Sequence, residues 1–352
     1  MGSWLKDYGP RLIVGLLMLV GITALALHFV GIPILQISKS GIGDFDGQIL
    51  YSRSMKQPIE VLPKQEVKEV FIMDLKSGRQ RQVTDHRSAS VRPVFSNIGP
   101  WIVYTSYVFH KKEKIRNADL FLYNLMTRER KLLSYKRGLN LAGSFDVKGR
   151  NVYFTIKQGK VLDIFRIGLD GKDFSRVTHG KRMRTLTKKG KTLKGRVHSS
   201  EPAISPDGTR MAFVSDRDGR PTLYIRDLKS KEDTRILFAG KYNTHPRWSP
   251  NGEQLVFQGY LKGHFDLFIV HSTGKNLRKI TRAKSPSGIW ANNESPDFSP
   301  DGKQIIFTSD RTGYNQLYII DSTGRNVRRL TYDTFHYYDP QWSDAVLPTD
   351  GK

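Results

Sequence analysis

The stretch Pro202-Ala203-Ile204-Ser205-Pro206-Asp207-Gly208 decides the fold, because the same pattern returns twice further along the chain. Its later copies are Pro246-Arg247-Trp248-Ser249-Pro250-Asn251-Gly252 and Pro296-Asp297-Phe298-Ser299-Pro300-Asp301-Gly302. In all three, an apolar run follows and places a phenylalanine 11 positions after the first proline. Proline presets φ and glycine accepts positive φ, so each copy predicts a tight β-hairpin.

Each hairpin belongs to a longer unit. Weaker copies keep the same interval, from Pro93 to Tyr104 and from Gly143 to Phe154. A third apolar run with a central aromatic follows each hairpin, and a fourth, more polar run such as Arg176-Val177-Thr178 closes most units. Four short strands per unit, repeated at intervals of roughly 44 to 59 residues, are typical of propeller blades.

The number of units comes from the third-run aromatics, which are Phe71, Phe121, Phe165, Tyr224, Phe268 and Tyr318. The first unit lacks a proline motif, but Asp339-Pro340-Gln341-Trp342-Ser343 follows the last unit without a hairpin of its own. We expect this segment to pair with residues 48–52 and close the ring, which would remove a raw sheet edge. The alternative is an open solenoid with a stray C-terminal strand. The predicted fold is therefore all-β, a six-bladed β-propeller closed in its first blade by the C-terminal strand.

The N-terminal region predicts one transmembrane α-helix before the propeller. Residues 12–35 are almost unbroken apolar sequence, long enough as a helix to cross a hydrocarbon core of about 30 Å. Lys6 and Arg11 precede this stretch and only Lys39 follows closely, so the positive-inside bias favours a cytoplasmic N-terminus. The expected organisation is a cytoplasmic N-terminus (1–11), a membrane helix (12–37), a linker (38–46), the propeller (47–343) and a C-terminal tail (344–352).

A cleaved signal peptide is the rival interpretation of the same region. Ala24-Leu25-Ala26 fits a small-x-small cleavage site, although residues 27–37 stay apolar beyond it. In both cases the propeller would be exported, to the periplasmic or outer side of a bacterial cytoplasmic membrane. A retained helix would make it a single-pass membrane protein.

Composition restricts the chemistry and suggests a class of partner. The chain has no cysteine, which excludes disulfides, thiolate metal sites and cysteine nucleophiles. Lys and Arg total 57 against 33 Asp and Glu, a formal net charge of +24 that favours anionic partners. Nucleic acid is not expected, because no basic motif with interleaved stacking aromatics appears and export argues against it.

The repeat resembles the TolB-type propeller repeat over roughly residues 47–343. The likeness is carried by the Pro-x-Trp/Phe-Ser-Pro-Asp-Gly pattern and by the segments Ser215–Gly219 and Ser309–Gly313. The resemblance implies a binding platform rather than a given activity. TolB also has an N-terminal α/β domain, in whose place this chain has the apolar segment. Peptidases with similar propellers use a Gly-x-Ser-x-Gly elbow, which this sequence lacks.

Long connections are expected on one face of the propeller. If the face at which the motif prolines begin the first strands is called the top, then residues 53–68, 107–118 and 179–199 all map there. Loops on a rigid scaffold commonly carry binding, whereas a charge run is often only a solvated surface. The candidate basic residues in the last two segments are Lys111, Lys112, Lys181, Arg182, Arg184, Lys188, Lys189, Lys191, Lys194 and Arg196.

A second candidate site is the rim of the central channel, formed by the residues before the motif prolines. These are Arg92, Glu201, His245, Ser295 and Asp339, with Glu294 beside them. They would either bind a cation or a cationic segment, or cap neighbouring backbone. A metal-dependent carbohydrate lyase would need converging ligands, and the histidines 245, 264, 271 and 336 show no such spacing.

The sequence therefore predicts a non-catalytic, membrane-anchored propeller that acts as a protein-binding scaffold or as an accessory subunit of an envelope complex. A periplasmic binding protein for an anionic polymer is the alternative. No cofactor is expected.

Overall fold

A computed structural model describes residues 45–55, 66–136, 138–179, 186–188, 191–193, 196–236 and 240–343. The expected cytoplasmic segment, membrane helix and C-terminal tail lie outside these residues. Within the described ranges, no helix combines the length and the apolar character needed to cross a bilayer. The described chain is built from β-strands, which confirms the all-β class.

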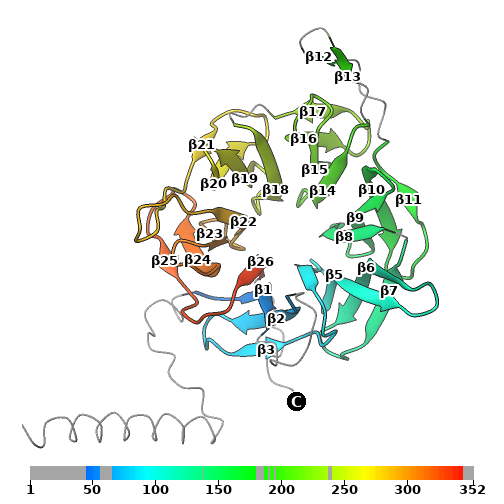
Figure 1. The fold of residues 1–352 in the computed structure, drawn as a ribbon, viewed down its shortest axis with the longest axis horizontal. Helices are drawn as coiled ribbons and strands as arrows, with labels where there is room; N and C mark the ends of the chain where they lie inside the picture. The colour runs from blue at the N-terminus through cyan, green and yellow to red at the C-terminus, as the bar shows by residue number, and fades with distance from the viewer. Residues whose placement is uncertain are drawn as a thin grey trace, which may run out of the picture. The chain divides into compact units, whose positions relative to one another are not determined.

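The strands form four four-stranded sheets, one eight-stranded sheet and the two-stranded pair β12–β13 (Figure 1). The eight-stranded sheet consists of two four-stranded antiparallel ladders, and we number the resulting four-stranded ladders as blades in chain order. Blade 1 contains β26 (Tyr337–Ser343), β1 (Gln48–Ser54), β2 (Lys68–Asp74) and β3 (Gln80–Gln82). Blade 2 contains β4 (Ser90–Phe95), β5 (Trp101–His110), β6 (Ile115–Asn124) and β7 (Arg130–Ser134). Blade 3 contains β8 (Leu139–Phe145), β9 (Asn151–Gln158), β10 (Val161–Gly168) and β11 (Ser175–Arg176).

The other three blades have the same strand order. Blade 4 contains β14 (Ser199–Ile204), β15 (Arg210–Ser215), β16 (Thr222–Asp227) and β17 (Asp233–Arg235). Blade 5 contains β18 (Tyr242–Trp248), β19 (Gln254–Leu261), β20 (His264–His271) and β21 (Arg278–Lys279). Blade 6 contains β22 (Asn293–Phe298), β23 (Gln304–Ser309), β24 (Gln316–Asp321) and β25 (Arg328–Arg329). A single parallel bridge, Ala118 to Leu139, links the ladders of blades 2 and 3.

Blade 1 joins residues from both ends of the propeller. Strand β26 pairs antiparallel with β1, so that Gln48 lies opposite Ser343 and Ile49 opposite Trp342. The indole Nε1 of Trp342 donates to the carbonyl oxygen of Asp46 at 3.0 Å. The pairing expected between the C-terminal motif and residues 48–52 is therefore present.

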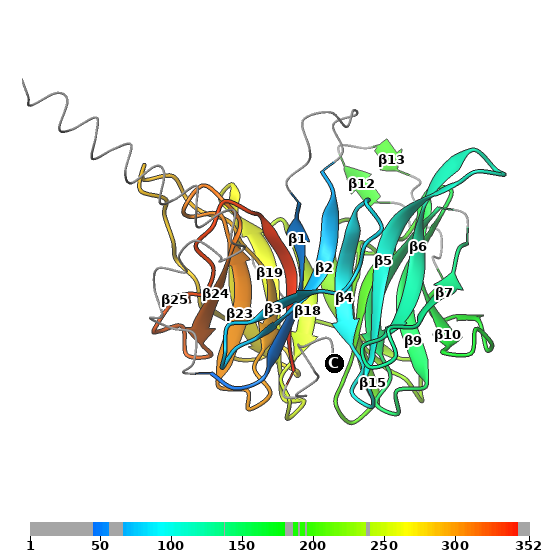
Figure 2. The same ribbon diagram turned by 90° about the horizontal axis from the view of Figure 1, so that it is seen from below.

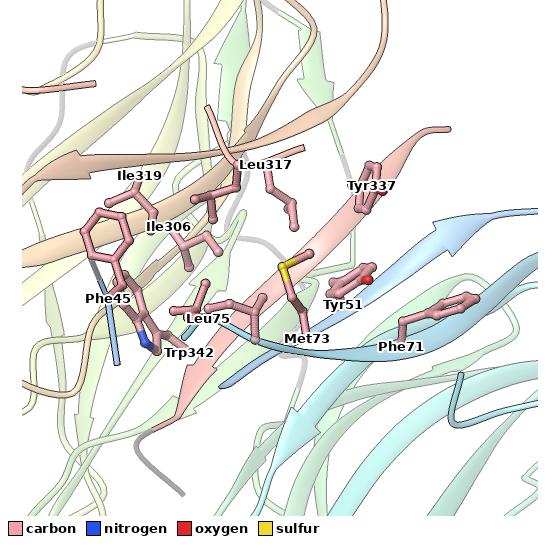
Figure 3. Close-up of a cluster of buried hydrophobic side chains, with 12 residues drawn as sticks. Phe45, Tyr51, Phe71, Met73, Leu75, Ile306, Leu317, Ile319, Tyr337 and Trp342 are labelled. Carbon is pink, nitrogen blue, oxygen red and sulfur yellow. The ribbon is translucent and has the colours of Figure 1, made fainter. Parts of the chain in front are cut away.

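Apolar clusters fill the gaps between successive blades, because side chains alternate between the two faces of each strand. The cluster between blades 6 and 1 contains Tyr51, Met73, Ile306 and Trp342 and is shown in Figure 3. Equivalent clusters lie between each of the other five pairs of neighbouring blades. Each blade thus buries both faces, which explains why its two central strands are almost continuously apolar.

The outer strand of several blades is fastened by a buried threonine. Thr84, Thr178, Thr281 and Thr331 each accept a hydrogen bond from a backbone N–H of the third strand, at 2.8 or 2.9 Å. In the first three cases the hydroxyl also donates to a buried acid of that strand, for example Thr281 to Asp266 at 3.0 Å. The polar fourth run of the repeat therefore supplies the bond that holds the blade edge.

Two segments expected as irregular loops contain regular strand pairing, which corrects that prediction. Residues 107–110 and 115–118 extend the β5–β6 hairpin, because Tyr107-Val108-Phe109 continues the strand pattern of residues 101–106. Residues 186–188 (β12) and 191–193 (β13) form a further short hairpin. Both hairpins project from the same face of the propeller, which we call the top (Figure 2).

Candidate functional site: the channel mouth

The innermost strand of most blades carries a bulge at the residue before its motif proline. Arg92, Glu201, His245, Ser295 and Asp339 all have φ between 48° and 56°. The strand pairing shifts register at each of these points. Proline has no N–H for the ladder, so pairing is interrupted there and a bulge can form. A positive φ is strained for these residue types, so the surroundings must compensate.

The compensation comes from the preceding blade. The amide of His245 donates to Oε2 of Glu201 at 2.8 Å, and the amide of Arg92 donates to Oδ2 of Asp339 at 3.2 Å. The amides of Ser295, Glu201 and Ala142 donate in the same way to Gln258, Thr155 and Thr105. Glu201 and Asp339 therefore cap the backbone of the next blade, one of the two alternatives left open by the sequence.

The same side chains also form a polar network around the axis. The Nη2 atom of Arg92 lies 2.8 Å from Oε1 of Glu201, and the hydroxyl of Ser295 lies 3.2 Å from Oδ1 of Asp339. The His245 ring lies between the two acids, with Nδ1 3.6 Å from Glu201 and Nε2 3.7 Å from Asp339. Its Nδ1 is buried and makes no hydrogen bond within the described structure.

The network strongly favours the ionised acids. Burial alone would raise the pKa of Glu201, but the charges of His245 and Arg92 lower it to about 2. The pKa of Asp339 is also lowered against the effect of burial, by the neighbouring His245 ring and by the charge of Arg92. By contrast, burial raises the pKa of Glu294, which lies beside the network. The mouth is therefore an internally paired ion cluster next to one poorly stabilised acid.

Little space remains inside this ring. The cavity between the mouth residues of all six blades measures about 20 Å³, enough for roughly one water molecule. A partner would therefore contact the mouth from above or displace the network.

The predicted basic residues that the structure describes lie outside the ring of mouth residues. Lys111 and Lys112 are exposed at the tip of β5–β6, and Arg196 is exposed before β14. Lys188 and Lys191 lie in the backbone pairing of β12 and β13. The remaining predicted residues lie outside the described residues: Lys181, Arg182, Arg184, Lys189 and Lys194. Binding at these positions and at the rim stays a prediction.

Sequence reasoning identified Glu201 and Asp339 but missed the other three side chains that receive bulge amides. Thr105, Thr155 and Gln258 all come directly after the aromatic that ends the second-strand run. Thr308 has the same position and donates to the carbonyl oxygen of Glu294 at 3.2 Å. A polar residue at this repeat position was the signal that could have identified them.

The described residues do not bring metal ligands together. Among them, no group of three or more His, Asp or Glu side chains is arranged to hold a metal ion. His245 and its two acids are the densest titratable cluster at the mouth, and their contacts are with Arg92, Ser295 and backbone amides.

Comparison with known proteins agrees with the architecture. The family model described as the TolB beta propeller domain matches residues 106–281 and 188–346. A curated relative, "Protein TolB homolog" of Chlorobium luteolum, is 30% identical over 144 residues, covering 41% of this chain and 29% of its own length. The crystal structure of TolB from Acinetobacter baumannii superposes with a TM-score of 0.68 at 23% identity, covering 86% of this chain and 68% of that one.

A tricorn protease structure is also similar, with a TM-score of 0.56 at 16% identity, covering 81% of this chain and 26% of that one. Structural similarity at these sequence identities shows the fold alone. It does not decide whether this propeller has a catalytic role. The class defined by fold and matches is an all-β, TolB-like propeller. This chain belongs to the TolB β-propeller domain family. It matches less than a third of the length of the curated TolB homologue.

Proposed function

We propose that this protein is a membrane-anchored, non-catalytic scaffold whose six-bladed propeller binds another protein of the bacterial envelope. In this proposal residues 12–37 form a single membrane helix, the N-terminus is cytoplasmic and the propeller lies on the outer side of the cytoplasmic membrane. The TolB family match supports the propeller platform, and the apolar sequence supports the anchor.

The observation that carries the proposal is a difference between the channel mouth, where the charged groups are paired with one another, and the top face, where charged and aromatic side chains are exposed. The acids and Arg92 at the mouth are used in holding blades together. Charged and aromatic side chains on the top face are instead exposed, including Lys111, Lys112, Phe109 and Trp290. A ring whose polar groups are paired internally, with charged and aromatic side chains exposed on one face, is the arrangement expected of a binding platform.

The experiment is affinity purification of the tagged full chain from its own membranes in mild detergent, followed by mass spectrometry. A partner in stoichiometric amount supports the scaffold function. Arg92→Met, Asp339→Asn and the exposed-loop variant Lys112→Glu then show whether partner binding depends on the mouth or on the top hairpins. Recovery of the propeller alone under several mild detergents would contradict the proposal.

The anchor and orientation have a separate test, for which the absence of cysteine is an advantage. A single Ser230→Cys substitution, in the exposed turn between β16 and β17, should react with a membrane-impermeant maleimide in intact spheroplasts. Ser3→Cys should react only after lysis. The reverse labelling pattern would overturn the proposed topology.

Binding of an anionic polymer is a second candidate function, favoured by the exposed lysines of the top face. Lys111, Lys112, Lys157 and Lys160 have no acidic partner among the described residues. Such binding should weaken steeply with salt, because ions compete with a polyanion for these charges. Retention on a polyanion column that persists at about 0.5 M salt, where the screening length is only a few ångströms, would count against it.

A further inference from the structure

Blade 5 carries an exposed aromatic patch on the top face that plays no part in the mouth network. It consists of Tyr242, Tyr260, Phe265, Ile289 and Trp290, and we call it the blade 5 patch. Tyr242, Tyr260 and Phe265 are half-buried neighbours at the upper ends of β18, β19 and β20. Ile289 and Trp290 lie in the loop from blade 5 to blade 6 and are 69% and 38% exposed.

The loop that presents Ile289 and Trp290 has a defined conformation. The amide of Ser285 donates to the carbonyl oxygen of Ile289 at 2.8 Å, and the amide of Gly288 donates back to Ser285 at 2.9 Å. Lys284 and Trp290 form an antiparallel bridge across the turn. Ile289, the most exposed large apolar side chain described, is therefore held outward by a built turn.

The aromatic rings of the patch are fixed by stacking. Tyr242 and Tyr260 are parallel at 4.9 Å, and Phe265 meets Tyr260 edge-on at 5.2 Å. Trp290 lies parallel to the His264 ring at 5.1 Å, with Nζ of Lys284 4.8 Å from its centroid. Rigid aromatic side chains lose little entropy on binding and are typical anchors of protein interfaces.

The segments that form the patch are basic, and the acids that contact them are already engaged. Asp266 contacts His264 and Lys279, and Asp310 accepts two hydrogen bonds from Asn292. Residues 240–242, 261–264 and 282–292 contain Lys241, Lys262, Arg282 and Lys284 and no Asp or Glu. All four side chains are exposed, and none has an acidic partner among the described residues. An apolar centre with a cationic rim is complementary to apolar residues flanked by acids.

We propose that the blade 5 patch anchors an acidic segment of a partner protein, with apolar side chains against Ile289 and Trp290 and carboxylates against the four surrounding cations. This inference rests on the proposed scaffold function and specifies its partner chemistry. An acidic polysaccharide fits less well, because sugars stack on open ring faces. Here Tyr242 and Tyr260 cover one another, and His264 covers one face of Trp290.

The test uses the full chain in mild detergent and a displayed library of random peptides as the probe. We expect selection of peptides that combine Asp or Glu with Leu, Ile, Phe or Trp. A selected peptide should bind Trp290→Ala at least about 10-fold more weakly, the loss expected for an interface hot spot. Lys262→Glu should also weaken binding, and more so at low salt.

Matched controls come from turns on the opposite face of the propeller. Met126→Ala removes an apolar side chain that is 56% exposed between β6 and β7, and Lys229→Glu reverses an exposed charge between β16 and β17. Both should leave peptide affinity within about 2-fold, a difference below 0.5 kcal/mol. If Trp290→Ala fails to fold, Ile289→Asp at the outermost position replaces it.

Three outcomes would overturn the proposal. The selected peptides could be neutral or basic, they could bind Trp290→Ala and Ile289→Asp as well as the unchanged chain, or polygalacturonate could bind at the patch while no peptide does. The experiments distinguish failure of the proposed patch interaction from failure of the proposed scaffold function. A native partner that is retained by patch variants but lost with Arg92→Met leaves the scaffold function standing, whereas absence of any stoichiometric partner removes both.

Discussion

The guanidinium of Arg92, on blade 2, lies 2.8 Å from the carboxylate of Glu201, on blade 4. Blade 3 lies between them and has Ala142 and Gly143 where other blades have a polar residue and a proline. This position therefore provides no long side chain of its own, and Arg92 reaches across it. Both side chains are largely buried, with 25% and 13% exposed.

Substitution of Arg92 should show how much this ion pair contributes to the free energy of unfolding. Arg92→Met keeps much of the side-chain volume but leaves the Glu201 carboxylate without its cation, at an expected loss of about 3 kcal/mol in unfolding free energy. Burial raises the pKa of Glu201, and the charges that now lower it to about 2 are partly lost. The stabilisation that Glu201 provides is present above the ordinary pKa of a glutamate and is lost as the pH falls towards the pKa of Glu201 in the folded chain. Because the variant lowers this pKa less, its acid unfolding should begin at a higher pH.

Chemical denaturation of a double-mutant cycle checks this prediction. Glu201→Gln in the Arg92→Met background should recover part of the loss, because the unpaired charge is then absent. A cost below about 1 kcal/mol for Arg92→Met, as seen for surface pairs, would mean that the contact is not significant.

Gly143 should tolerate no side chain, because blade 4 packs directly on it. A Cβ at this position would lie 2.6 Å from Cγ of Pro202 and 2.7 Å from the carbonyl oxygen of Tyr153. Gly143→Ala should therefore cost about 2 to 4 kcal/mol through overpacking and backbone shift. Thermal unfolding measures the loss.

Gly159 provides the comparison for this substitution. It has a φ of +59°, and an added Cβ would meet nothing within 4 Å. Gly159→Ala should thus cost only about 1 kcal/mol, the conformational cost of a left-handed residue. Equal losses at the two positions would contradict overpacking of Gly143 against Pro202.

Asp297 should make the propeller less stable as pH rises. It is buried in the channel wall, where its Oδ2 accepts a hydrogen bond from the amide of Trp342 at 3.0 Å. Burial raises the pKa of this carboxyl to about 6, while Arg247, 4.0 Å away, lowers it only in part. An acid with a raised folded pKa gives stability that is full below its ordinary pKa and is lost as pH rises through about 6.

Asp297→Asn keeps an acceptor oxygen and removes this pH dependence. The variant should be more stable than the unchanged chain at pH 8, by roughly 1 to 3 kcal/mol, from a shift of about two pKa units. Midpoints of thermal unfolding between pH 4 and 8 provide the measurement. Parallel curves for the two chains over this range would contradict the raised pKa.

The sequence predicted the fold through its repeat, and the mouth only in part. The proline motifs located the innermost strands, and Asp339-Pro340 located the strand that pairs with β1. Arg92, Glu201, His245 and Asp339 were expected on one rim because they share a repeat position, and they do meet. Their mutual pairing could not be predicted, since it depends on side-chain length and on the small residues of blade 3.

The blade 5 patch was not predicted, for a related reason. Tyr242 is well separated in sequence from Tyr260 and Phe265, and the three rings come together only through the strand register of β18, β19 and β20. The prediction of irregular loops at 107–118 and 179–199 was wrong in part. Both segments contain strand pairing that their charged residues made hard to recognise in the sequence. Lysines at a hairpin tip disrupt the apolar pattern without disrupting the ladder.

The threonine that holds the outer strand should contribute more to the free energy of unfolding where its hydroxyl also donates to an acid. In blade 5, Thr281 accepts from the amide of Leu267 at 2.8 Å and donates to Asp266 at 3.0 Å. In blade 6, Thr331 accepts from the amide of Leu317 at 2.9 Å, but Gln316 stands in place of the acid. Valine at either site leaves a buried amide unpaired, which costs about 1 to 3 kcal/mol.

Only Thr281→Val also removes a donor from a buried carboxylate, so its loss should exceed that of Thr331→Val by about 1 kcal/mol or more. Thr281→Ser retains the hydroxyl and should remain close to the unchanged chain. Denaturant unfolding of the three variants separates the two contributions. If both valine variants lost the same stability, the carboxylate bond would be unimportant, and the threonine would serve only to pair the amide of the third strand.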